Sequence, residues 1–206
     1  MDRKRWMWSA FVLLGLAAAG WSQTNLKCSR YALFGTVHST DSHTLVLDRH
    51  LKRAPSVLLS LGVSDATRLA RLTLADTDAL AVGETVLLIG DAPRHDFEPR
   101  LAIVGADANV DTLRAAMYGF YRWRAEAGLN PLFGEHRAIG VVTALNPVVV
   151  RLGRFHCTID PSALLTVARL QSATPADLSP GAGLSVLTAR LDSGALGAGV
   201  VVISGL

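Results

Sequence analysis

The chain has 206 residues, which favours one or two domains, and its 50% hydrophobic and 18% charged residues exclude a disordered polypeptide. Its net charge of +3 gives little support to nucleic-acid binding, because the charged residues 2–5 alone supply +2 of that value. We therefore expect a folded protein with no nucleic-acid partner.

The N-terminus begins with a basic segment that is followed by an uncharged stretch. Residues 6–20 are rich in Leu, Ala and Trp, and the stretch ends in small residues. This order is typical of a secretory signal peptide within residues 1–23. A retained membrane anchor at residues 6–22 is the alternative, because a helix of this length spans about 25 Å, at the short limit for a ~30 Å hydrocarbon core. Both interpretations place the rest of the chain on the extracytoplasmic, periplasmic side, either released or anchored in the inner membrane.

Two segments of the chain repeat the same pattern. Residues 35–47 and 140–152 both open with Gly-x-Val, turn at a polar pair and close on an alternating β-branched run. Further along, residues 77–87 and 175–187 share a second pattern, in which a turn that contains Asp and Gly precedes an apolar run. A repeat of this kind sets the architecture, so we expect two similar units.

Each copy contains short β-rich runs that are separated by Gly, Asp and Pro turns. The predicted strands are at 44–47, 57–63, 69–74, 84–89 and 101–104 in the first copy, and at 148–152, 154–159, 164–167, 184–189 and 200–203 in the second. Such spacing predicts a mainly β fold with two tandem, small, five-stranded OB-like barrels, at residues 24–105 and 135–206. The hydrophobic N-terminal segment is expected to precede them as a helix.

Residues 106–134 interrupt the β pattern. Apolar residues recur there near helical spacing, Asp107, Asn109 or Asp111 can cap the start, and Gly128 can end the helix. We therefore predict a linking amphipathic helix between the two barrels.

This predicted helix concentrates aromatic and arginine side chains. One interpretation is structural, with the aromatic face packed on the two barrels. The other is a docking face for a protein partner or for the membrane interface, where Trp, Tyr and Arg are enriched. The candidate partner-binding residues are Tyr118, Tyr121, Arg122, Trp123 and Arg124.

The repeated glycine and core positions resemble those of a group of bacterial secreted proteins with repeated OB-like barrels, the DUF5666 group. The matching residues are Gly35, Val37, Leu80, Gly83, Glu84, Val86 and Ala102 in the first copy, and Gly140, Val142, Asp177, Leu178, Gly181 and Val186 in the second. The second copy departs from the pattern at Ala182, where an acidic residue is usual, and the helix has no counterpart. The resemblance implies an extracytoplasmic β-barrel fold and supplies no catalytic activity.

The chain contains two cysteines, Cys28 and Cys157. An even number of cysteines in an oxidising compartment permits one disulfide, which would join the segment before the first copy to a strand of the second. Two separate buried thiols are the alternative.

The polar residues show no arrangement that is typical of catalysis. The six histidines lack the spacing of a zinc motif, and the chain has no haem-attachment motif, nucleophile elbow or phosphate-binding loop. Asp41-Ser42-His43 holds the residue types of a catalytic triad, but adjacency in sequence does not give triad geometry. We therefore expect no enzyme activity, catalytic residue, metal or cofactor.

Two functions remain open. The first is a non-enzymatic, extracytoplasmic module that mediates protein binding or assembly, as an accessory subunit of a membrane complex. The second is a small-ligand or oligosaccharide-binding protein that uses an OB-like groove. The basic turn at Arg49, Lys52 and Arg53 is interpreted as a solvated rim, with contact to anionic lipid headgroups as a lesser alternative.

Overall fold

The computed structural model describes residues 28–51, 54–91, 97–128, 136–160, 165–191 and 193–205. The predicted signal peptide or anchor at residues 1–23 lies outside these ranges. Within them, no helix has the length and apolar character needed to cross a membrane. The protein is mainly β, as the sequence predicts.

The two copies contain the same elements in the same order. The first copy consists of β1 (Cys28–Thr40), β2 (Thr44–Leu51), β3 (Ala54–Gly62), β4 (Arg68–Ala75), the 3-10 turn η1 (Thr77–Ala79), β5 (Thr85–Asp91) and β6 (Glu98–Gly105). Helix α1 (Val110–Glu126) follows. The second copy consists of β7 (His136–Leu145), β8 (Val148–Leu152), β9 (Phe155–Ile159), β10 (Thr166–Ser172), the 3-10 turn η3 (Pro175–Asp177), β11 (Gly183–Arg190) and β12 (Leu196–Ser204). The described part of each copy thus has six strands, one more than predicted, because the Gly-x-Val segment forms a strand of its own.

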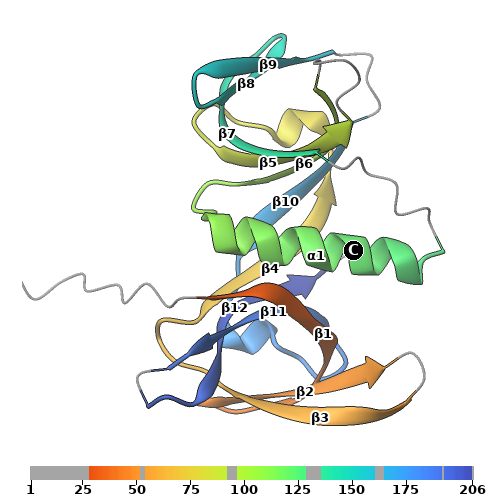
Figure 1. The fold of residues 1–206 in the computed structure, drawn as a ribbon, viewed down its shortest axis with the longest axis vertical. Helices are drawn as coiled ribbons and strands as arrows, with labels where there is room; N and C mark the ends of the chain where they lie inside the picture. Colours follow the sequence, from red (N-terminus) through yellow and green to blue (C-terminus); the bar gives the residue numbers. More distant parts are fainter. Residues whose placement is uncertain are drawn as a thin grey trace, which may run out of the picture.

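The strands of the two copies are interleaved. The sheet order is β11-β1-β2-β3-β12-β4-β10-β6-β5-β7-β8-β9, and an additional pairing joins β11 to β12. The lower strand group in Figure 1 therefore consists of β1, β2 and β3 from the first copy with β11 and β12 from the second. The upper strand group consists of β5 and β6 from the first copy with β7, β8 and β9 from the second.

The pairing crosses the boundaries predicted for the two barrels, because several strands of residues 24–105 pair with strands of residues 135–206. The repeat shows which strands are equivalent, but equivalent strands offer nearly the same partners. Exchanging them between copies therefore keeps the contacts while changing the connectivity, as in domain swapping.

Strands β4 and β10 join the two strand groups. They pair antiparallel, with Leu72 opposite Leu170. On either side of this pair, Ala70 lies opposite Ser172 and Leu74 lies opposite Ala168. Ala70 and Leu74 of the first copy are equivalent to Ala168 and Ser172 of the second, so a twofold rotation exchanges these two pairs. The outer edge of β4 pairs in parallel with β12, and that of β10 pairs in parallel with β6. The fold therefore has a pseudo-twofold axis at the Leu72–Leu170 pair.

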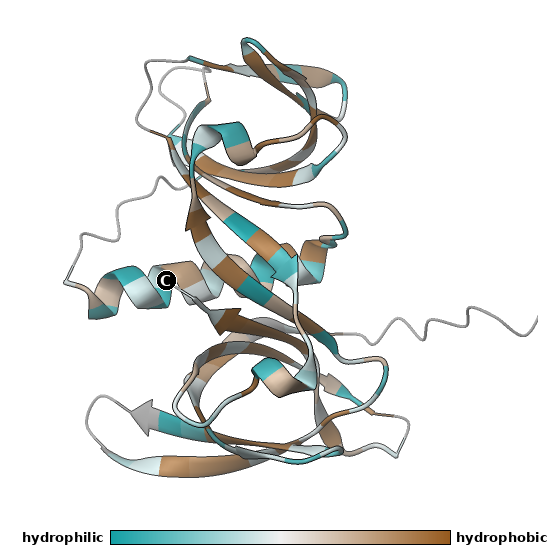
Figure 2. Ribbon diagram, turned by 180° about the vertical axis from the view of Figure 1, so that it is seen from behind, coloured by the Kyte–Doolittle hydropathy of each residue, from teal (hydrophilic) through white to brown (hydrophobic). Residues whose placement is uncertain are grey.

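The hydrophobic core has three parts. One cluster fills the lower strand group around Leu45 and Val201, and a second fills the upper group around Val86 and Val150. A third lies between α1, through residues such as Phe120, and the central strands. Figure 2 shows the apolar segments following the strands of both groups, as expected when each sheet face covers a core. Helix α1 lies across the middle of the molecule between the groups (Figure 1).

The glycine of the repeated Gly-x-Val pattern is required by a close backbone approach. A Cβ atom on Gly35 would lie 2.3 Å from the carbonyl oxygen of Asp48, and one on Gly140 would lie 2.4 Å from that of Arg151. In both hairpins the strand pairing shifts register within a few residues of this glycine. The repeated glycine therefore lets the first strand of each copy bend against the second.

Alanine at either of these glycines is expected to destabilise the fold. Gly35→Ala and Gly140→Ala each place a methyl group against rigid backbone, which is expected to lower the free energy of unfolding by about 1–3 kcal/mol. Gly183→Ala is the control, because its Cβ would meet no atom closer than 3.6 Å. Denaturant unfolding of the three variants provides the measurement, and equal stabilities would contradict this role of the glycines.

The interleaved strands also predict that neither half folds alone as a monomer. When the chain is cut between residues 128 and 136, the first piece lacks β11 and β12, and the second lacks β5 and β6. Each piece is expected to show no cooperative unfolding as a monomer, whereas mixing or co-expression restores a stable complex. Circular dichroism with mass determination tests this, and a monomeric piece with a cooperative transition would contradict this prediction.

Candidate functional site

Helix α1 forms where the sequence predicts it and begins at one of the three predicted caps. The side-chain oxygen of Asn109 accepts hydrogen bonds from the Thr112 backbone N–H at 2.8 Å and from its hydroxyl at 2.9 Å. This satisfies one of the N–H groups that a helix leaves unpaired at its start. The helix runs to Glu126, and its buried face packs on the central cluster.

The middle of α1 is held close to strand β11. The buried hydroxyl of Ser185 donates a hydrogen bond to the carbonyl oxygen of Ala115 at 2.8 Å. A Cβ atom on Gly119 would lie only 3.2 Å from the Cβ of Ser185, so glycine permits this approach. These contacts lie about one and two turns before Arg122, and they therefore fix how closely this part of the helix approaches β11.

Phe120 of α1 is fully buried, and Tyr118, Tyr121 and Trp123 are half-buried and pack against the central cluster. Tyr118 and Phe34 are in edge contact, with ring centroids 6.4 Å apart, and the rings of Phe120 and Trp123 are 5.4 Å apart. Burial raises the pKa of Tyr121, and the charge of Arg137 opposes this shift. These contacts give the aromatic cluster a structural role.

A groove opens between the C-terminal half of α1 and the strands beneath it, with a volume of about 270 Å³. We call it the α1 groove. At its edge, Arg122 and Glu126 form an ion pair with a 2.5 Å separation between Nε and Oε1. The lining residues are Phe34, Gly35, Thr36, Leu72, Gly119, Arg122, Trp123, Glu126, Gly183, Leu184, Ser185, Val202 and Ser204.

The structure brings two of the five predicted partner-binding residues, Arg122 and Trp123, to this groove. Tyr118, Tyr121 and Arg124 are half-buried on the same helix but do not line it. Sequence reasoning missed the strand residues of the groove. Their proximity depends on β1 pairing with β11 of the other copy, and no local pattern of the sequence reveals that pairing.

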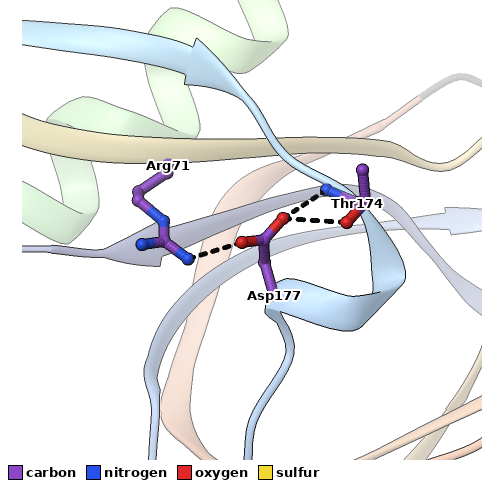
Figure 3. Close-up of polar contacts among 3 residues, drawn as sticks. All are labelled: Arg71, Thr174 and Asp177. Carbon is purple, nitrogen blue, oxygen red and sulfur yellow. Dashed lines mark hydrogen bonds and ion pairs between the residues drawn. The ribbon is translucent and has the colours of Figure 1, made fainter.

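Two arginines of the central strands link the copies at the 3-10 turns. Arg71 on β4 forms an ion pair of 2.6 Å with Asp177, whose carboxylate also accepts hydrogen bonds from the backbone N–H and the hydroxyl of Thr174 (Figure 3). These hydrogen bonds hold the pKa of Asp177 below its usual value. On β10, Arg169 bonds to the buried carboxylate of Glu84 and to the carbonyl oxygen of Ala79.

The two copies bind these arginines through acidic residues at different positions. Glu84 and Ala182 both follow the positive-φ glycine of their copy, Gly83 or Gly181. In the first copy the acidic residue at this position binds the arginine of the opposite central strand. In the second copy Asp177, in the 3-10 turn, takes over that contact.

Of the two alternatives for the cysteines, the structure has two separate thiols with no disulfide between Cys28 and Cys157. Cys28 is half-buried against the central cluster, whereas Cys157 belongs to the core of the upper strand group. They are thus held in different parts of the core. Burial raises the pKa of Cys28 to about 11, and the nearby carboxylate of Asp111 adds to this shift.

No family model, curated protein or solved structure matches this chain. Among the described residues, no group of three or more His, Cys, Asp or Glu side chains is placed to hold a metal ion. The α1 groove is therefore weighed on its own geometry as the candidate functional site.

The state of the thiols leads to a prediction about their reactivity. Denatured protein prepared without reductant is expected to titrate as two free thiols per chain. In the native protein, Cys28 is expected to alkylate slowly at neutral pH, because raising the pKa from 9.0 to about 11 lowers the thiolate fraction roughly a hundredfold. Its alkylation rate is expected to rise with pH through that range and to increase in Asp111→Asn, which peptide mass mapping measures. Fast alkylation of native Cys28 at neutral pH would contradict the described environment.

Proposed function

We propose that the protein is a non-enzymatic, extracytoplasmic module that mediates protein binding or assembly, as an accessory subunit of a membrane complex. The observation that carries this proposal is the α1 groove, where Trp123 and Arg122 from the helix meet strands of both copies. Aromatic and arginine side chains are the types enriched at protein interfaces.

The size and lining of the groove favour a protein segment as its occupant. A volume of about 270 Å³ is at or below the lower limit for small-molecule pockets and suits one or two large side chains. Phe34, Trp123 and Leu184 offer apolar contact, while Arg122 and Glu126 supply charge of both signs at the edge. We therefore propose that the groove takes an apolar side chain of a partner segment whose neighbouring residues are polar.

We further propose that each strand group is an OB-like barrel assembled from both copies. Support comes from the lower strand group, in which the β11–β12 pairing closes the ring β11-β1-β2-β3-β12 and β3 runs parallel to β12. Such closed barrels serve as rigid supports for binding surfaces. The resemblance to the DUF5666 group and the hydrophobic segment at residues 6–22 support a periplasmic location, released or held at the inner membrane.

A second candidate function is the binding of a small ligand or oligosaccharide. It is favoured by an open pocket of about 750 Å³ at one end of the upper strand group. Its lining combines apolar residues with the polar side chains of Asp78, Asn146 and Asp160. This volume is within the usual range for ligand sites.

A blocking substitution and site-specific cross-linking test the protein-binding proposal. Gly183→Val is expected to fill the α1 groove with little loss of stability, because a Cβ there meets only Ser204, at 3.6 Å. A photoreactive residue in place of Thr36, which lines the groove, is expected to cross-link a partner in native membranes, and Gly183→Val is expected to reduce that yield about tenfold.

The matched control places the photoreactive residue at Val82, which is exposed and does not line the groove. Equal cross-linking from positions 36 and 82, or a yield that Gly183→Val leaves unchanged, would refute binding through the groove.

A further inference from the structure

Strand β3 has an open edge along most of its length. It pairs with β2 from Ala54 to Gly62, but its other edge pairs with β12 only at Gly62, opposite Gly197. No other described strand pairs with it. The backbone N–H and C=O groups on this edge are therefore available to another strand.

The open part of β3 projects beyond the core. Leu61 is fully buried, whereas Val57 and Leu58 are 49% and 54% exposed, so exposure rises toward the β2–β3 turn. Figure 1 shows β2 and β3 extending as a two-stranded ribbon along the bottom of the molecule. Because two strands alone are marginally stable in water, a third strand on this edge would stabilise the ribbon.

The composition of β3 lacks the features that usually protect an open edge. The strand reads Ala-Pro-Ser-Val-Leu-Leu-Ser-Leu-Gly and contains no charged residue. Soluble proteins commonly place lysines, other charged residues or prolines on such edges to prevent pairing. In β3 the single residue of this kind is Pro55, near the start of the strand. The segment from Val57 to Leu61 is therefore suited to pairing with another strand.

The strand at the equivalent place in the upper group differs. There, β9 is the last strand of the sheet and has five residues, against nine in β3. Its outermost exposed apolar residue, Phe155, is flanked by the exposed basic residues Arg154 and His156. A short edge with basic residues resists pairing, so the two ends of the molecule are not equivalent in this respect.

We propose that the protein forms a twofold dimer in which β3 of one copy pairs antiparallel with β3 of a second copy. A neutral strand is complementary to itself, because no like charges meet when two copies align about a twofold axis. The β4–β10 ladder shows that equivalent strands of this sequence already pair in this way about a pseudo-twofold axis. The pairing continues each lower sheet into its neighbour and covers Val57 and Leu58.

Sedimentation of the full chain in density-matched detergent tests this proposal. The wild-type protein is expected to sediment as a dimer, and Val57→Lys and Leu58→Lys are each expected to weaken the dimer about tenfold or more, because each variant places a charged side chain on the paired edge of both copies. Both positions are half-exposed in the monomer, and circular dichroism checks that each variant folds.

Phe155→Lys is the matched control, because it places the same charge on the exposed edge strand of the other group and is expected to leave the dimer unchanged. A wild-type protein that is monomeric at every concentration would overturn the proposal, as would a dimer that both β3 variants retain. A monomer that still cross-links a partner through position 36 would overturn the β3 dimer while leaving the α1 groove function in place.

Discussion

The antiparallel pairing of β4 with β10 is the interaction on which the rest of the structure depends. These strands carry the chain from one strand group to the other, and their outer edges hold β12 and β6 in parallel. Arg71 and Arg169 extend from the same ladder to the 3-10 turns of the opposite copies. A break in this ladder would leave β4 paired only with β12 and β10 only with β6, and it would remove the strand pairing that joins the lower group to the upper one through the central strands.

The sequence predicts the elements of this fold far better than their connections. The strand patterns, the helix with its cap at Asn109 and the repeated Gly35 and Gly140 are all local, because each follows from residue spacing or from one turn. A strand of one copy can pair with a strand of its own copy or with the equivalent strand of the other copy, and the two partners are nearly alike in chemistry. Local patterns therefore cannot show which of the two it pairs with. They predict the strands of the two tandem barrels but not the exchange of strands between the copies.

The same distinction separates the predicted and missed parts of the candidate site. Arg122 and Trp123 stand out on a helix that is rich in aromatic and basic residues, and both line the α1 groove. Gly183 and Ser204 carry no such signal, since they reach the groove only because β11 and β12 return to the first copy. The cysteines stayed open between a disulfide and two separate thiols, because an even cysteine count permits a bond without placing the two sulfur atoms together.

The interleaved strand order also has a consequence for the order in which the chain folds. The strands of the upper group, β5 to β9, are contiguous in sequence, whereas β1 pairs with β11 from the far end of the chain. Contacts between distant segments form slowly, because closing a long loop costs entropy before any contact is gained. We therefore expect the upper group to form first, as hydrogen-exchange labelling during refolding can show by earlier protection of β5 than of β1. Until β11 and β12 arrive, β1 to β3 remain a partial sheet with open edges, so the lower group is the part most exposed to aggregation or to chaperones during folding.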